Sequence, residues 1–393
     1  MLFEESDLLK ELPKQFFAGL VAKVNAKVAE GADVINLGQG NPDQPTYDHI
    51  VEALCTSAHN PASHKYSQFR SNHPFKEAAT SFYKKHYGID LDAEREICVT
   101  GGAKIGLVEL PLALMNPGDL LLLPDPGYPD YLSGVSLGRV TYETFPLTAE
   151  NDFLPDLEAI PEETARRAKF IYINYPNNPT GAVATKAFYE KLVAWAKTYE
   201  VGVVSDLAYG ALGYQGYENP SFLSVPGAKD VGIEFYTFSK TFNMAGWRLA
   251  FAAGNDQMIE ALNLIQDHLF VGIFPALQDA GIAALLDPKS EEAVTQLNAV
   301  YDSRRDAFTQ AAAKIGWQAF PSKGSFYAWM PVPEGYTSES FADLLLEKVH
   351  VAVAPGKGFG PAGDGYVRIG LLVAPERLVE AVNRIADLHL FDH

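Results

Sequence analysis

The chain has 393 residues, of which 47% are hydrophobic and 20% charged, a composition typical of a folded protein with a sizeable core. Its formal net charge of −18 argues against nucleic-acid binding and attachment to anionic membranes, because both require basic surface. The two cysteines, Cys55 and Cys98, have no paired spacing, and the N-terminus lacks the basic flank and apolar core of a signal peptide. We therefore expect a soluble, cytoplasmic protein with two or three lobes.

Strand-like and helix-like segments alternate through the middle of the chain. The predicted strands are residues 96–100, 120–124, 169–174, 202–206, 234–238 and 248–253, and helical patterns such as 103–115 and 185–199 lie between them. Short β-branched or aromatic runs separated by amphipathic helices predict a mostly parallel sheet with helices on both faces.

The pattern changes after about residue 275. A long helix over 289–315 precedes mixed elements and a final helix near 375–387, which predicts a smaller α+β lobe. The predicted division is a large domain of residues 46–280 and a small domain formed by 1–45 and 281–393. The glycine-rich run "PGKGFGPAG" (355–363) precedes no suitable helix and is predicted to be a mobile surface loop.

Candidate functional residues follow the predicted strands, because ligands of open α/β sheets bind beyond the carboxyl ends of the strands. The run Gly101-Gly102-Ala103-Lys104 opens a helix, where free backbone N–H groups can bind a phosphate. Other candidates lie at or near the ends of later strands, but each also has an ordinary structural explanation as a turn, a helix cap or a solvated side chain: "NYPNNPTG" (174–181), Asp206, Tyr209, Lys240 and Arg248.

Taken together, these motifs are more specific than any one of them. The ordered set G-G-A-K, D-P-G-Y-P, N-N-P-T-G, D-x-x-Y and S-K, with an arginine eight residues after that lysine, resembles the fold type I pyridoxal-phosphate aminotransferases of class I/II. The resemblance extends from "NLGQGNPDQPT" (36–46) to "GYVRIGL" (365–371), nearly the whole chain. It implies the fold type I architecture, with a seven-stranded-type sheet in the large domain.

The resemblance also implies a role for individual residues. Lys240 would bind pyridoxal 5'-phosphate covalently and move the substrate proton, and Asp206 would pair with the pyridine nitrogen. Tyr209 and Asn178 would hydrogen-bond the phenolic oxygen of the ring, and Tyr128 would stack on its face.

The same resemblance implies binding sites for two anions. The cofactor phosphate would be bound by Gly102, Ala103, Lys104, Thr237, Ser239 and Arg248, and by Tyr66 of a neighbouring subunit in a homodimer with shared active sites. The family usually has glycine five residues after that tyrosine, where this chain has Ser71, which puts the register of the loop in question. Arg368 would bind the substrate α-carboxylate with help from Asn178 and Gly38.

The substrate is less well specified by the sequence. Segments such as "LPKQFFAGL" and "PDPGYPDYLSGV" most resemble bacterial methionine-salvage aminotransferases, which convert 4-methylthio-2-oxobutanoate to methionine. Phe16, Phe17 and Tyr131 either line an apolar pocket for the thioether chain or belong to the core. The alternatives are an aminotransferase for aromatic, aspartate or diaminopimelate-type substrates and a carbon–sulfur β-lyase on the same fold.

Two other classes of protein are disfavoured by the sequence. The aminotransferase pattern begins within the first forty residues and leaves no room for the DNA-binding domain of a related transcription factor. His59, His64, His73 and His86 show no metal-ligand spacing, so we expect no metal site.

Overall fold

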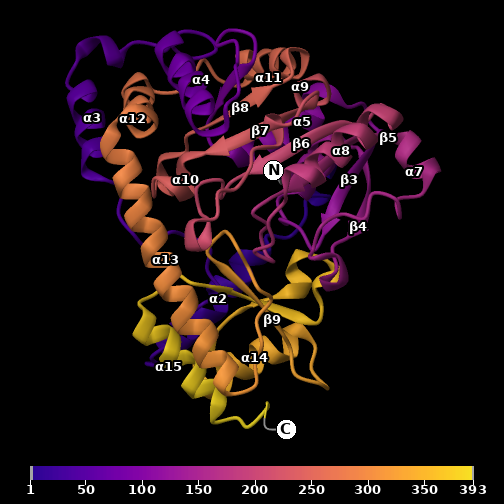
Figure 1. Cartoon of the computed structure of the whole chain (residues 1–393), viewed down its shortest axis with the longest axis vertical. Coiled ribbons are helices and arrows are strands. Elements are labelled where there is room, and N and C mark those ends of the chain that lie inside the picture. The colour runs from indigo at the N-terminus through magenta and orange to yellow at the C-terminus, as the bar shows by residue number, and fades with distance from the viewer. Residues whose placement is uncertain (1–2, 392–393) are drawn as a thin grey trace.

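The computed structural model describes residues 3–391, in which a large lobe built on one sheet is joined to a smaller lobe that carries the C-terminus (Figure 1). The long helix α13 (Pro288–Lys314) runs from the first lobe to the second. Across these residues, no helix is both long enough and apolar enough to cross a membrane.

The large lobe contains a seven-stranded sheet in the order β2-β8-β7-β6-β5-β3-β4. Five of its strands form parallel pairs, β3–β4, β3–β5, β5–β6 and β6–β7, whereas β8 is antiparallel to its neighbours β2 and β7. The predicted fold class is thereby confirmed. The strands are β2 (Ile97–Thr100), β3 (Leu120–Asp125), β4 (Thr141–Pro146), β5 (Ala168–Asn174), β6 (Gly202–Leu207), β7 (Gly232–Thr237) and β8 (Ala250–Gly254).

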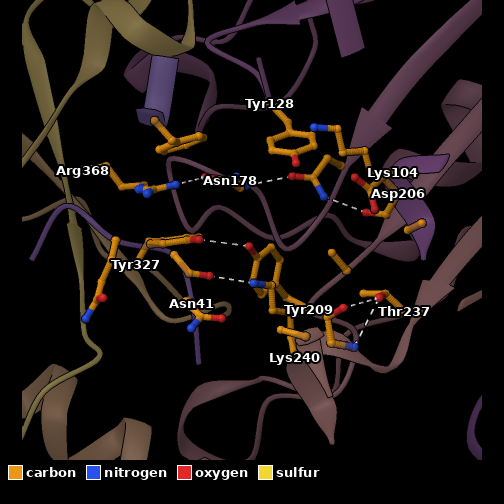
Figure 2. Close-up of a pocket in the computed structure, with 18 of the residues that line it drawn as sticks. Asn41, Lys104, Tyr128, Asn178, Asp206, Tyr209, Thr237, Lys240, Tyr327 and Arg368 are labelled. Atoms are coloured by element: carbon orange, nitrogen blue, oxygen red, sulfur yellow. Dashed lines mark hydrogen bonds between the residues drawn. The ribbon is translucent and has the colours of Figure 1, made fainter. Parts of the chain in front are cut away.

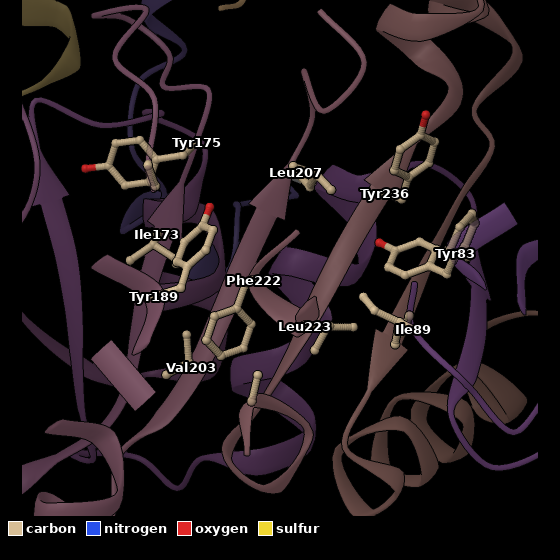
Figure 3. Packing of buried hydrophobic residues seen from close by; sticks show 14 of the residues in the cluster. Tyr83, Ile89, Ile173, Tyr175, Tyr189, Val203, Leu207, Phe222, Leu223 and Tyr236 are labelled. Atoms are coloured by element: carbon tan, nitrogen blue, oxygen red, sulfur yellow. The ribbon is translucent and has the colours of Figure 1, made fainter. Parts of the chain in front are cut away.

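Helices cover both faces of this sheet, and successive residues of a strand alternate between the two resulting cores. On β3, Leu120 and Leu122 belong to one core, and Leu121 and Leu123 to the other. This is the two-residue period of a strand that is buried on both faces. Figure 3 shows the first core, where Ile173 and Val203 from the sheet pack among large aromatic rings.

The first core is covered mainly by α4 (His73–Tyr87), α8 (Lys186–Tyr199) and α12 (Pro275–Leu286), and the second by α5 (Ala103–Leu114), α6 (Tyr131–Gly138) and α11 (Asp256–Leu269). The remaining helices of the N-terminal region and the large lobe are α1 (Asp7–Lys10), α2 (Phe16–Ala29), α3 (Asp48–Ala58), α7 (Glu162–Arg167), α9 (Ala228–Val231) and α10 (Phe238–Thr241). Short 3-10 helices are η1 (Pro61–His64), η2 (Ala149–Asn151), η3 (Tyr214–Gly216), η4 (Phe222–Ser224) and η5 (Ala245–Trp247).

The smaller lobe has its own antiparallel sheet, β11-β12-β9, and its own apolar core. A second, two-stranded sheet joins β1 near the N-terminus to β10 in parallel, which brings the N-terminal segment onto this lobe. The exact domain boundaries remain a prediction. The elements are β1 (Ile35–Asn36), β9 (Tyr327–Pro331), β10 (Val351–Ala352), β11 (Ala354–Pro355), β12 (Tyr366–Gly370), α14 (Ser338–Val349) and α15 (Pro375–Ala386).

The prediction of a surface loop at 355–363 is wrong. The segment forms η6 (Gly356–Phe359) and η7 (Pro361–Gly363), and Phe359 is only 4% exposed. Its backbone accepts a hydrogen bond from the Gly127 N–H (2.8 Å), and the Ala362 N–H donates to the Asp125 carboxylate (2.9 Å). Gly360 has φ 134°, and a Cβ there would collide with Asp125, so glycine is needed for this contact between the lobes.

Candidate active site

A cavity of about 550 Å³ opens between the carboxyl ends of the central strands and the smaller lobe (Figure 2). The large lobe contributes residues that follow or end β5, β6 and β7, and the smaller lobe contributes β9 and β12. Residues 38–41 and the helix α2 form a further part of the wall. The cavity therefore lies where the strand-end rule places a ligand.

Asp206 lies near the end of β6 and is 6% exposed. Its Oδ2 accepts a hydrogen bond from the Tyr131 hydroxyl at 2.8 Å, whereas Oδ1 is buried without a partner among the described residues. Burial raises the pKa of this carboxyl to about 6, although the bond from Tyr131 and the charge of Lys240 oppose that shift. A buried, half-satisfied carboxylate is suited to a bound N–H donor.

Lys240 projects from α10 into the same cavity. Its Nζ donates to the Gly40 carbonyl at 2.7 Å and lies 5.3 Å from the centre of the Phe326 ring. Burial lowers the pKa of the ammonium to about 7, with the cations of Arg368 and Arg248 adding to the effect and Asp206 opposing it. A large share of this lysine is therefore a neutral, nucleophilic amine near neutral pH.

An anion-binding cradle lies at the N-terminus of α5. Gly102 caps that helix with φ 103°, and a Cβ there would collide with the Arg248 guanidinium. Ala103 follows as the first helical residue, where N–H groups lack helical partners. Thr237 and Ser239 line the same cavity and are hydrogen-bonded to each other at 3.0 Å.

Lys104 and Tyr128 also line the cavity, and both contact Asp130. The Lys104 ammonium pairs with the Asp130 carboxylate at 2.8 Å, and the Tyr128 hydroxyl donates to the same oxygen at 2.6 Å. The charge of Lys104 is thus already paired, while the Tyr128 ring faces the cavity (Figure 2).

Arg368 on β12 is 1% exposed, and its side-chain hydrogen bonds among the described residues go to neutral oxygens rather than to a carboxylate. Its Nη1 donates to the Asn178 side-chain oxygen at 2.8 Å and its Nη2 to the Gly38 carbonyl at 3.0 Å. Its Nε is buried and has no hydrogen-bond partner within residues 3–391. A buried cation that is held only by neutral oxygens favours a bound anion.

Aromatic rings surround the Arg368 guanidinium. The ring centres of Tyr327, Phe359 and Phe17 lie 4.2, 4.8 and 5.2 Å from its central carbon. Tyr327 also accepts a hydrogen bond from the Tyr209 hydroxyl at 3.2 Å. No motif in the sequence marks Tyr327, which begins the ordinary-looking apolar strand β9.

The structure brings together all the predicted site residues except Tyr66. That side chain is 91% exposed and lies outside the cavity. Asn178 presents its oxygen to Arg368, so its amide nitrogen is the group left to donate to a ligand. The Gly38 N–H donates to the Asn36 side chain, so Gly38 contacts Arg368 through its carbonyl instead.

The three aromatic residues considered for an apolar pocket have different environments. Phe17 lines the cavity, together with Leu20 and Val21 of the same helix α2. Phe16 is not among the lining residues and packs on Phe359, with ring centres 5.7 Å apart. Tyr131 is buried and its hydroxyl donates to Asp206, and it is not among the lining residues.

These features fit pyridoxal phosphate. Asp206 has an unpartnered oxygen for a ring N–H, and Lys240 supplies an amine for the aldehyde. The cradle at Gly102 and Arg248 suits a phosphate, and Arg368 suits a second, substrate anion. Together with the seven-stranded sheet, they define a pyridoxal-phosphate-dependent transaminase of fold type I.

Comparison with known proteins agrees with this class. The family model "Aminotransferase class I and II" matches residues 32–385. An L-glutamine--4-(methylsulfanyl)-2-oxobutanoate aminotransferase of Bacillus subtilis is 58% identical over 391 residues, covering 100% of this chain and 98% of that protein. An LL-diaminopimelate aminotransferase of Aquifex aeolicus is 47% identical over 390 residues, covering 99% of this chain and 100% of its own length.

Solved structures agree as well. Substrate-bound BacF from Bacillus subtilis superposes with a TM-score of 0.94 at 47% identity, covering 100% of this chain and 99% of that one. The chain belongs to the class I and II aminotransferase family, whose members depend on pyridoxal phosphate.

Proposed function

We propose that this transaminase makes methionine by moving an amino group from an amino acid such as glutamine to 4-(methylsulfanyl)-2-oxobutanoate. The observation that supports this substrate is the apolar wall of Phe17, Leu20 and Val21 beside the carboxylate-binding Arg368. An unbranched thioether chain can bury its surface there. The B. subtilis relative is named for the same oxo acid.

The charged residues of the cavity support the same choice. All of those from this chain have a proposed role in cofactor or α-carboxylate binding: Lys104, Asp206, Lys240, Arg248 and Arg368. None is left over for a second carboxylate on the substrate side chain, so the described residues favour an uncharged side chain.

In the proposed reaction, bound pyridoxal phosphate supplies a ring that withdraws electrons from the substrate α-carbon. The unpartnered Oδ1 of Asp206 would accept the ring N–H and so keep that nitrogen protonated. Arg368 binds the α-carboxylate and orients the α-hydrogen toward Lys240. The Lys240 Nζ then takes that proton and returns it, which its lowered pKa of about 7 permits.

The proposal includes a homodimer in the cytoplasm with active sites shared between subunits. Tyr66 does not line the cavity of its own chain, and it is strongly exposed beside Phe274, which is also exposed. Exposed aromatic residues of this kind are typical of an interface. Tyr66 would then donate to the cofactor phosphate of the partner.

The experiment is a panel of oxo acids assayed with glutamine, glutamate and alanine as donors. We expect the highest kcat/KM for 4-(methylsulfanyl)-2-oxobutanoate and no turnover by Lys240→Ala. Preference for a dicarboxylic, aromatic or diaminopimelate-type substrate would reject methionine synthesis, and pyruvate released from cystathionine would favour a β-lyase. Normal transamination by Lys240→Ala would reject the mechanism itself.

A further inference from the structure

The segment 38–45, which we call the strap, crosses the edge of the cavity and contacts a cation from each lobe. Its Gly38 carbonyl accepts from Arg368 at 3.0 Å, and its Gly40 carbonyl accepts from the Lys240 Nζ at 2.7 Å. The strap contains the Asn-Pro-Asp run of "NLGQGNPDQPT", for which the proposed reaction has no role.

The strap contributes no residue to the apolar cores. Leu37 before it belongs to the core of the smaller lobe, and Tyr47 after it packs against the core of the large lobe. Between them, residues 38–45 are held by polar contacts, so those contacts determine where the two carbonyls lie.

The strongest of these contacts joins Asp43 to Arg304 on α13. The Arg304 guanidinium donates to both carboxylate oxygens, at 2.8 and 2.6 Å, in the two-point geometry that fixes orientation as well as distance. Arg304 is 5% exposed, and its Nη1 also donates to the Leu371 carbonyl at 3.2 Å. Leu371 directly follows β12, the strand that carries Arg368.

One buried side chain thus ties the strap to the strand of the carboxylate-binding arginine. Partial burial raises the pKa of Asp43, but the hydrogen bonds and charge of Arg304 outweigh this effect and hold the pKa below its usual value, so the carboxyl is ionised. A buried arginine is costly unless it is paired, and losing the pair would release the strap.

We infer that Arg304 is a positioning residue that acts through Asp43, fixing the Gly38 and Gly40 carbonyls against Arg368 and Lys240 and so setting the affinity for the substrate carboxylate. The inference rests on the proposed role of Arg368.

The test measures binding of 4-(methylsulfanyl)butanoate to the pyridoxal-phosphate-loaded protein by calorimetry. This acid has the carboxylate but no oxo or amino group, so it cannot react. Asp43→Asn and Arg304→Lys each lose the two-point pair, and we expect about tenfold weaker binding, the change in Kd that corresponds to the loss of one charge-assisted hydrogen bond. In turnover, KM for the oxo acid should rise more than kcat falls.

Two further variants make the outcome decisive. Lys357→Met removes an exposed ion pair with Glu339 in the smaller lobe and should bind the acid like the unmodified protein. Arg368→Met should abolish binding. If it does not, the proposed carboxylate site is wrong and the inference falls with it. If Arg368→Met abolishes binding while Asp43→Asn stays within about twofold, the site stands and the positioning role is overturned.

Discussion

At the scale of single residues, Lys240 owes its chemistry to its surroundings. Burial, then the cations of Arg368 and Arg248, lower its pKa from 10.5 to about 7. Because only the neutral amine attacks an aldehyde, the rate at which the cofactor-free chain binds pyridoxal phosphate covalently should rise with pH and level off above about 7.

Stopped-flow absorbance measures this rate. Arg368→Met removes a nearby cation, so the midpoint should move to higher pH. A midpoint near that of free lysine, about 10.4, would show that the fold does not lower the pKa of this amine.

A second residue-scale expectation concerns Tyr131. Its hydroxyl is the hydrogen-bond donor to Asp206, and that bond lowers the pKa of the carboxyl. In Tyr131→Phe the loss of this charge-assisted bond, worth about 1.5 kcal/mol, should raise the pKa of Asp206 further. Less of the carboxyl is then ionised at neutral pH, so the Kd for pyridoxal phosphate should rise about tenfold. Fluorescence titration measures this Kd.

Tyr172→Phe is the matched control. Tyr172 lies beside Tyr131, with ring centres 5.3 Å apart, but its hydroxyl donates to the Leu107 carbonyl. If the Kd for pyridoxal phosphate rose equally in both variants, the hydrogen bond from Tyr131 to Asp206 would not be the cause of the weaker binding.

The functional residues could be predicted from the sequence only where a local motif marked them. Asp206 closes one predicted strand and Lys240 follows another, so the strand-end rule and the family resemblance indicated them. Tyr131 reaches Asp206 across 75 positions, and Tyr327 reaches Tyr209 across 118. Such contacts depend on how elements pack, which periodicity does not encode.

At the scale of elements, the loop before α4 holds Ser71 with φ 72°, in the left-handed region. The expected glycine is absent, yet the loop keeps the conformation that glycine favours. Ser71→Gly should therefore raise the free energy of unfolding by up to about 1 kcal/mol, since the left-handed conformation costs other residues roughly that amount.

Thermal or denaturant unfolding measures this effect. Ser136→Gly on the helix α6 is the control, and it should destabilise, because glycine is unfavourable inside a helix. If Ser71→Gly instead lowered the free energy of unfolding, the contacts of the serine side chain would stabilise the fold by more than its left-handed backbone conformation costs.

Some of the secondary-structure elements could be predicted from the sequence and others could not. The buried strands β3, β5, β6 and β7 were identified because their apolar runs are long and bounded by turns. β4 was missed, since this edge strand is mostly exposed and reads "TYETFP". The 355–363 segment was misassigned because glycines that permit close packing look the same in sequence as glycines of a mobile loop.

At the scale of the whole molecule, we expect a homodimer. Tyr66, Phe69 and Phe274 are 91%, 63% and 47% exposed on one chain, which is costly for aromatic side chains unless a second copy covers them. One chain has a mass of 42.9 kDa, and light scattering should give twice this value.

Tyr66→Phe should weaken pyridoxal phosphate binding several-fold, because it removes one hydrogen bond to the phosphate. The mass of the dimer measured by light scattering should not change. A monomer with full activity at assay concentration would contradict the shared active site.

The most direct test of the whole account is to reduce the pyridoxal-phosphate-loaded protein with borohydride and map the modified peptide by mass spectrometry. We expect one phosphopyridoxyl group per chain, attached to Lys240. Attachment to another lysine, such as Lys104, or no attachment at all, would contradict it.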